Sequence, residues 1–290
     1  MGVKKGSIRG PYKRRERPFK RVISCSFGKD SIATVLLAKE MGIPIDYVVF
    51  VEVMYDGVSG ISGEVPIHID WVKSVGIPML RDLGFNVVHL VGDDDYLSIF
   101  NRQIRSGRGV GKINGFPLAS RCYVQRECKL RPIRRFYKDE IFSQGYDVLE
   151  YVGIAIDEPT RIVSLEKSYS PKVKKDSLLV RYGYTETMSL LKCQEYGLLS
   201  PIYTSGVGRN GCWFCPNQGI SSFYKFRIDY PDMWQYLRDL SLVDNRASVF
   251  FKYDKTVDDI DKMIDEYEAK YGKYYNLLGN NNVDYEKGVN

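Results

Sequence analysis

Histidine is almost missing from this chain of 290 residues, which contains only His68 and His89. Acid–base or metal chemistry based on histidine is therefore not expected. His89 falls within a predicted strand, where a histidine is more often part of the core than a base. Catalysis, if present, must come from other side chains.

Long apolar segments are missing as well. No run of apolar residues approaches the roughly 20 that a membrane-spanning helix needs, so we expect no membrane partner. The basic N-terminus has no apolar stretch behind it, and we expect no secretory signal. The six cysteines then predict reduced thiols or metal ligands rather than disulfides, and a cytoplasmic location.

The composition is that of a soluble globular protein, with 44% apolar and 27% charged residues. The net charge of +6 is unevenly placed, because nine lysines and arginines against Glu16 lie in residues 1–21. This basic arm either follows nucleic-acid phosphates or is a solvated leader. A second basic group consists of Lys129, Arg131, Arg134 and Arg135.

Strands and helices alternate over the first half of the chain. Apolar, β-branched runs predict strands at 21–25, 46–53, 85–91 and 147–155, and a helix over 63–83 is interrupted near Gly76 and Pro78. This order predicts a parallel sheet with ligands at the carboxyl ends of its strands. Further on, the helical spacing of Tyr230, Met233, Trp234 and Leu237 favours a stripe that faces the core over a base-stacking surface.

A short glycine-containing loop follows the first predicted strand. It reads Ser26-Phe27-Gly28-Lys29-Asp30-Ser31 and precedes a good helix sequence. A strand, a glycine turn and a helix point backbone N–H groups and the positive helix end at an anion, and Lys29 adds a charge. The spacing is shorter than that of the Gly-x-x-x-x-Gly-Lys-Ser/Thr loop. The alternative is a turn that merely joins strand to helix.

This loop resembles that of the PP-loop ATP pyrophosphatase superfamily, in the branch of the phosphoadenosine phosphosulfate (PAPS) reductases. The resemblance implies an α/β fold, a Rossmann-like parallel sheet with helices on both faces (adenine nucleotide alpha hydrolase-like). It also implies that Ser26, Phe27, Gly28, Lys29, Asp30 and Ser31 bind ATP or a related adenine nucleotide with Mg²⁺. The usual reaction of the superfamily splits ATP into an adenylylated substrate and pyrophosphate.

Two further segments extend the resemblance. The stretch from Gly153 to Arg161 resembles the second signature of the PAPS reductase branch, although Ala155 stands where that branch often has an arginine. The resemblance implies that Gly153 and Glu158 bind the nucleotide. Asp157 or Glu158 is expected to hold magnesium, and Arg161 to clamp a phosphate or form a surface ion pair. Lys129, Arg131 and Arg161 are the expected ligands of an anionic substrate. Glu64 begins a helix and is expected to cap it.

The cysteines give the second strong signal. Gly211-Cys212-Trp213-Phe214-Cys215-Pro216 places two thiols on a tight turn, a half-site for a soft metal that distant cysteines can complete. Cys25 lies inside the first strand and is expected in the core. A similar Cys-Trp-x-Cys-Pro element occurs in bacterial and phage PAPS reductase-like proteins, and related tRNA thiolases and a DNA phosphorothioation enzyme use an iron–sulfur cluster.

The resemblance therefore implies a 4Fe–4S cluster, with Zn²⁺ or no metal as the alternatives. The preferred ligands are Cys128, Cys193, Cys212 and Cys215, with Cys122 as a substitute for Cys128. If only three bind, the fourth iron stays open to sulfide.

Together these features predict an ATP-dependent transferase that adenylylates a nucleic acid (tRNA or DNA) or a nucleotide-like substrate, with Lys29, Asp30, Asp157 and Arg161 in catalytic roles. Its reaction would transfer sulfur with the help of the cluster. The alternatives are a nucleotide- and metal-binding regulatory or defence module without turnover, and a sulfonucleotide reductase. The reductase is disfavoured because no cysteine follows Cys215. A homodimer or a partner protein is compatible with either class.

Four regions are expected. They are a basic arm (1–21), a PP-loop nucleotide-binding domain (22–165), a mainly helical, cysteine-bearing metal and substrate region (166–278) and a flexible tail (279–290).

Overall fold

A five-stranded parallel sheet forms the centre of the protein. The computed structural model describes residues 17–117, 122–168, 170–205 and 211–277. The strands run in the order β5 (Val87–Val91), β2 (Tyr47–Glu52), β1 (Phe19–Ser24), β7 (Asp147–Val152) and β8 (Val173–Asp176), and every neighbouring pair is parallel. This order confirms the predicted α/β fold; β8 at the edge was not expected, because two of its four residues are lysines.

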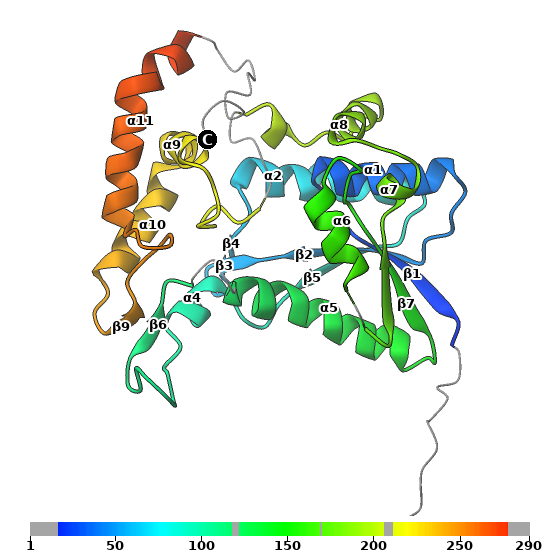
Figure 1. The fold of residues 1–290 in the computed structure, drawn as a ribbon, viewed down its shortest axis with the longest axis horizontal. Coiled ribbons are helices and arrows are strands. Elements are labelled where there is room, and N and C mark those ends of the chain that lie inside the picture. Colours follow the sequence, from blue (N-terminus) through cyan, green and yellow to red (C-terminus); the bar gives the residue numbers. More distant parts are fainter. Residues whose placement is uncertain (1–16, 118–121, 169, 206–210, 278–290) are drawn as a thin grey trace, which may run out of the picture.

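Helices cover both faces of the sheet (Figure 1). On one face α1 (Lys29–Glu40), α7 (Leu178–Arg181), α8 (Glu186–Glu195) and a helical run pack against apolar side chains of β1, β2 and β5. That run joins α2 (Pro66–Trp71), the π-helical turn η1 (Val72–Gly76) and α3 (Ile77–Asp82), so the predicted interruption is a wide turn at Gly76 and not a break.

The opposite face is covered by one continuous helical stretch. It consists of η3 (Gln125–Leu130), α5 (Arg131–Phe136) and η4 (Tyr137–Phe142), and it packs Ile133, Tyr137 and Ile141 against β1, β2 and β7. Alternate residues of the central strands thus enter two separate cores, as parallel strands buried on both faces require.

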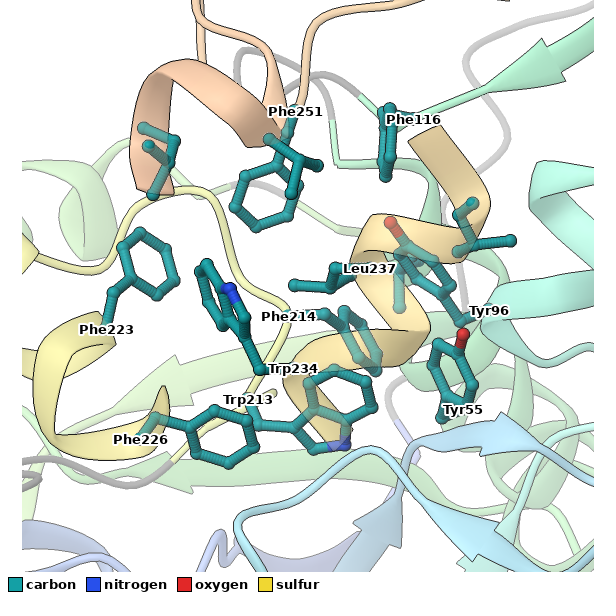
Figure 2. Packing of buried hydrophobic residues seen from close by; sticks show 14 of the residues in the cluster. Tyr55, Tyr96, Phe116, Trp213, Phe214, Phe223, Phe226, Trp234, Leu237 and Phe251 are labelled. Carbon is teal, nitrogen blue, oxygen red and sulfur yellow. The ribbon is translucent and has the colours of Figure 1, made fainter. Parts of the chain in front are cut away.

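The C-terminal helices build a third core that is rich in aromatic rings (Figure 2). Helices α9 (Ile220–Asp229), α10 (Pro231–Leu242) and α11 (Val257–Leu277) surround Trp213 and Trp234, which are both fully buried. Trp234 and Leu237 are buried and Tyr230 and Met233 pack against this core, which confirms the core-facing stripe.

Residues from the first half of the chain enter the same aromatic core. Tyr55 and Tyr96 pack there beside Phe214, and Phe116 packs beside Phe251. The short elements around this core are β3 (Met54–Asp56), β4 (Ile61–Ser62), α4 (Tyr96–Phe100), β6 (Ile113–Gly115), the 3₁₀ turn η5 (Pro201–Tyr203) and β9 (Arg246–Ser248), whereas α6 (Pro159–Glu166) follows β7 and packs on β8. The C-terminal helices therefore share a core with segments that follow the carboxyl ends of β2 and β5.

Across the described ranges, no helix combines the length and the apolar character needed to cross a membrane. The predicted basic arm up to residue 16 and the predicted tail lie outside the described residues.

Candidate functional site

The loop between β1 and α1 has a shape that depends on a buried phenylalanine. Phe27 adopts a left-handed backbone conformation with φ of 57°, which is costly for a residue with a side chain. Its ring is fully buried, 5.3 Å from the Phe50 ring and 6.4 Å from the Trp71 ring. The core thus holds the loop in a conformation that the local sequence alone would not favour.

Internal hydrogen bonds stabilise the same loop. The Ser31 hydroxyl donates to the Gly28 carbonyl at 2.9 Å and accepts from the Ser26 N–H at 3.2 Å. Ser31 was predicted to bind phosphate, and here its hydroxyl supports the loop from inside. Gly28 is the residue before the first turn of α1 and has no side chain to cap it. The backbone N–H groups of the first helical turn must therefore find acceptors other than a capping side chain at Gly28.

Lys29 has partners at three of its atoms. Its N–H donates to the Tyr203 hydroxyl at 2.9 Å, and its carbonyl lies 3.1 Å from the Cys193 thiol. Its ammonium group lies 2.9 Å from Asp30 and 3.5 Å from Glu186. Partial burial raises the pKa of Asp30, and the ammonium group of Lys29 opposes this shift. The C-terminal half of the chain thus contacts the loop directly.

The segment after β7 closes against this loop. A Cβ at Gly153 would lie only 2.7 Å from the backbone carbon of Asp30 and from the nitrogen of Ser31. Only glycine permits this approach without a backbone shift. Gly153, predicted as a nucleotide-binding residue, therefore lies beside the first turn of α1, as expected for strands whose carboxyl ends meet at one edge.

The other predicted residues of this segment form a network among themselves. Glu158 accepts from the Ala155 N–H at 3.0 Å and pairs with Arg161 at 2.6 Å. Arg161 also donates to the Gly153 carbonyl at 3.2 Å. Asp157 accepts from the Glu186 N–H at 3.0 Å, at the start of α8. The surface ion pair, which was the alternative for Arg161, is therefore present, and Asp157 is separately linked to Lys29 through Glu186.

His68 supports the loop from beneath, a role that its sequence did not suggest. Its Nε2 lies 3.2 Å from the Ser26 carbonyl and its Nδ1 lies 2.7 Å from the Ser200 hydroxyl. Burial lowers the pKa of His68 to about 4, so the ring is neutral at pH 7. Because a carbonyl can only accept, Nε2 carries the proton and Nδ1 accepts from Ser200. His68 thereby links the loop to the segment that holds Tyr203.

The positive charge of Lys129 acts on the buried carboxyl of Glu64. Glu64 is 5% exposed; burial raises the pKa of its carboxyl, and the positive charge of Lys129 opposes this rise. The same charge lowers the pKa values of His68 and of the fully buried Cys25 thiol. In the described part of the chain Lys129 has no ion pair, so its charge is available to an anion. Arg131, in contrast, pairs with Asp94 and Glu127.

A second polar cluster lies at the carboxyl ends of β2 and β5. Glu52 accepts from Lys73 and from His89, each at 2.9 Å, and is 2% exposed. Burial alone would raise the pKa of Glu52. The hydrogen bonds have the larger combined effect and lower this pKa to about 2, so Glu52 is ionised. The three side chains line a cavity of about 560 Å³ that also includes Asp94. Sequence reasoning assigned His89 to the core, but its side chain is 28% exposed.

The cysteines fall into two groups. Cys128 is buried in the aromatic core, and Cys122 and Cys212 pack against it; Cys215 is joined to Cys212 through a turn with an N–H to carbonyl bond of 2.9 Å. Cys193 lies in the core beneath α1, with its thiol on the Lys29 carbonyl. Cys25 also lies in that core, as expected.

The predicted four-ligand set is therefore not assembled around Cys193. Among the described residues, no three histidine, cysteine, aspartate or glutamate side chains come close enough to hold a metal ion. Burial raises the pKa of Cys128 and of Cys193 to about 12. The thiols of Cys122, Cys128, Cys212 and Cys215 are of the ligand type that soft metals prefer, although the structure does not bring them within metal-binding distance.

Residues missed by the sequence reasoning are Tyr203, His68 and Glu52. Tyr203 lies 174 positions from Lys29 and carries no motif of its own. Glu52 ends a strand with five consecutive buried residues, and a charged residue in such a run was the available signal.

The fold and the site define an α/β protein whose sheet presents a glycine loop and a helix N-terminus at its carboxyl edge. No model of a known protein family matches the sequence, and no curated protein matches it. Among solved structures, a similar chain is the U34-tRNA thiolase NcsA from Methanococcus maripaludis with its 4Fe–4S cluster. The two are 11% identical, with a TM-score of 0.37 and coverage of 95% of this chain and 77% of that chain. A likeness of this size says nothing about function.

Proposed function

We propose that this chain is an ATP-dependent enzyme of the PP-loop type, similar to the PAPS reductase branch. The observation that supports this proposal is the close approach of Gly153 to Asp30 and Ser31 at the N-terminus of α1. A turn that merely joined a strand to a helix would need neither the left-handed Phe27 nor a second loop packed on the first helical turn. Both features leave backbone donors at a fixed place for phosphate.

The proposed reaction is adenylylation. An oxygen of the substrate attacks the α-phosphorus of ATP, a new P–O bond forms, and the bond to the β-phosphate breaks and releases pyrophosphate. A sulfur nucleophile then displaces AMP. Lys29 would neutralise the charge of the phosphates once its ammonium group leaves Glu186. Asp30, with Asp157 or Glu158, would help to position Mg²⁺ beside the phosphates. Arg161 lies beside the same loop and would bind an anionic group of the substrate.

The substrate proposed here is a nucleic acid, tRNA or DNA, or a nucleotide-like molecule. Lys129 is a half-buried cation, and its charge lowers the pKa values of Glu64, His68 and Cys25. A cation in this position suits a phosphate of the substrate.

Sulfur transfer would need a metal centre near the same edge. We place it on Cys122, Cys128, Cys212 and Cys215, and not on Cys193, because the first three belong to or pack on the aromatic core and Cys215 lies on the same turn as Cys212. An iron–sulfur cluster there would supply a site for sulfide, whereas zinc with four thiolates would be structural. The backbone of Glu64 pairs with that of Cys212, which ties this group to the helix beside the loop.

The decisive test is the product of ATP turnover. We expect the protein with ATP, Mg²⁺ and bulk tRNA or DNA to yield AMP and pyrophosphate, and Lys29→Ala to lose this activity. Lys39→Ala is the matched control, since Lys39 lies in the last turn of the same helix and donates to the Leu83 carbonyl. An unchanged rate in Lys29→Ala, or release of ADP and phosphate, would refute the proposal.

The second candidate is a nucleotide- and metal-binding module without turnover. One observation favours it: both the N–H and the ammonium group of Lys29 already have protein partners. Such a module would bind ATP and release no pyrophosphate with any acceptor. The same assay therefore separates the two candidates.

A further inference from the structure

Positive charge is concentrated in one segment outside the phosphate loop. Residues 101–136 contain ten arginines and lysines and a single acid, Glu127. This segment alone carries more positive charge than the net +6 of the whole chain. Sequence reasoning noted only its last part, residues 129–135.

The first part of the segment is a glycine-rich loop that holds cations outward. Gly107, Gly109 and Gly111 have positive φ values between 79° and 95°. The loop is closed by backbone bonds between Ile104 and residues 111–112 and is anchored by the Asn245 amide, which donates to the Gly111 carbonyl at 2.9 Å. It is therefore a defined hairpin.

The cations of this hairpin are exposed to solvent. Arg105, Arg108 and Lys112 are exposed, and no ion pair joins them to any residue that the structure describes. Carboxylates that would neutralise them are missing from residues 101–112. An external anion is thus the natural partner of these three side chains.

A second row of cations continues the surface along η3 and α5. Arg126, Arg131 and Arg135 have side chains 57–67% exposed, and each also pairs with a neighbouring acid, respectively Glu127, Asp94 and Asp93. Asp94 joins the two parts, because it pairs with Arg102 at 2.8 Å and with Arg131 at 3.2 Å. In Figure 1 the loop between α4 and β6 lies at one end of the helix labelled α5. We call residues 102–112 and 126–135 the basic surface.

An aromatic ring lies on the same surface. Tyr123 is 46% exposed, and the Arg126 guanidinium lies 4.7 Å from the centre of its ring. An exposed ring beside arginines suits an unstacked base whose phosphates are bound by neighbouring cations. Lys129 lies on the same helical turn as Arg126. Its positive charge lowers the pKa values of Glu64 and His68, which lie near the phosphate loop.

We propose that the basic surface binds the phosphodiester backbone of a nucleic acid and leads it past Lys129 to the phosphate loop. This inference deepens the proposed function, on which it rests for the identity of the substrate. The binding itself needs no ATP. It can therefore be measured separately from turnover.

The test compares two triple charge reversals in the full-length protein. Arg105→Glu with Arg108→Glu and Lys112→Glu removes the cations of the hairpin. Lys167→Glu with Lys262→Glu and Lys270→Glu is the control, because it changes the net charge equally at exposed positions directly after α6 and on α11. Binding of a labelled RNA hairpin, a single-stranded RNA and a DNA duplex is measured without ATP at several salt concentrations, after circular dichroism confirms folding.

We expect the hairpin variant to bind at least about tenfold more weakly, while the control binds as the wild type does. The salt slope of log K should become less negative by about two to three, since each lost phosphate contact contributes roughly 0.7–0.9. The probe that binds most tightly shows whether the basic surface prefers RNA or DNA. Equal losses in both variants, or no loss in the hairpin variant, would overturn the inference. Pyrophosphate release by Lys29→Ala tests the proposed function alone, and that variant should retain nucleic-acid binding.

Discussion

The Tyr203 hydroxyl accepts a hydrogen bond of 2.9 Å from the Lys29 N–H. This N–H is one of the donors at the start of α1 that a phosphate oxygen would use. Binding of a phosphate at this position must therefore displace the phenol or share the donor with it. Burial raises the pKa of Tyr203, so the phenol is neutral at physiological pH.

Tyr203→Phe is expected to raise the affinity for ATP. The substitution removes the competing acceptor, and a hydrogen bond contributes about 0.5–1.5 kcal/mol net, which corresponds to roughly twofold to tenfold. Calorimetry with a non-hydrolysable ATP analogue measures the change. Tyr196→Phe is the control, since its hydroxyl bonds to Glu40 at the far end of α1. Weaker binding by Tyr203→Phe would instead show that the hydroxyl helps to hold the nucleotide.

Gly153→Ala is expected to damage the loop. The new methyl group would meet the backbone of Asp30 and Ser31 at 2.7 Å, so the first turn of α1 must move. We expect a loss of about 1–3 kcal/mol in the free energy of unfolding and nucleotide binding at least about tenfold weaker. Gly272→Ala in α11, whose methyl group would meet only side chains, should leave nucleotide binding unchanged. Normal affinity in Gly153→Ala would argue against a phosphate site at this turn.

Glu52 should make stability depend on pH in the acid range. Its pKa is lowered from 4.5 to about 2 in the folded protein, so its contribution is complete above pH 4.5 and is lost as pH falls towards 2. A shift of this size corresponds to roughly 3 kcal/mol. The difference in unfolding free energy between wild type and Glu52→Gln, measured with urea, should shrink between pH 6 and pH 3.

The exposed Asp82→Asn serves as the reference for Glu52. It lies at the end of α3 and takes part in no ion pair with a described residue. Its effect should be small at both pH values. A difference for Glu52→Gln that stayed constant with pH would contradict the assigned ionisation.

The two groups of cysteines predict different outcomes for serine variants. After anaerobic purification, we expect Cys212→Ser to lose iron and sulfide, or zinc, and Cys193→Ser to retain the metal. Cys25→Ser, a substitution in the same core as Cys193, is the control. The measurements are visible absorption and analysis of iron, acid-labile sulfide and zinc. Loss of metal in Cys193→Ser at the level of Cys212→Ser would restore Cys193 to the ligand set.

Much of the sheet could be predicted because its signals are local. The β-branched runs at 21–25 and 46–53 correspond to β1 and β2, and the glycine loop lies between β1 and α1 as expected. Gly153 was found through its place after a strand. In each case the periodicity or a glycine within a few residues carries the information.

The support of the site was beyond prediction because it depends on contacts between distant segments. His68 bonds to Ser200, 132 positions away, and Tyr203 bonds to Lys29 across 174 positions. Cys193 and Cys212 were grouped by residue type, but they lie in different cores because α8 packs on α1 while the Cys212 turn packs on the aromatic rings. Residue type alone does not state which core a thiol enters.

The packing of Phe27 has a consequence for the history of this sequence. A methyl group at Gly76 would lie 2.8 Å from the Phe27 ring, and Phe27 fixes the left-handed turn of the loop. Position 76 can therefore acquire a side chain only when position 27 becomes smaller. In related chains, positions 27 and 76 should therefore change together. Substitutions in the helical run at Gly76 are in this way coupled to the shape of the loop.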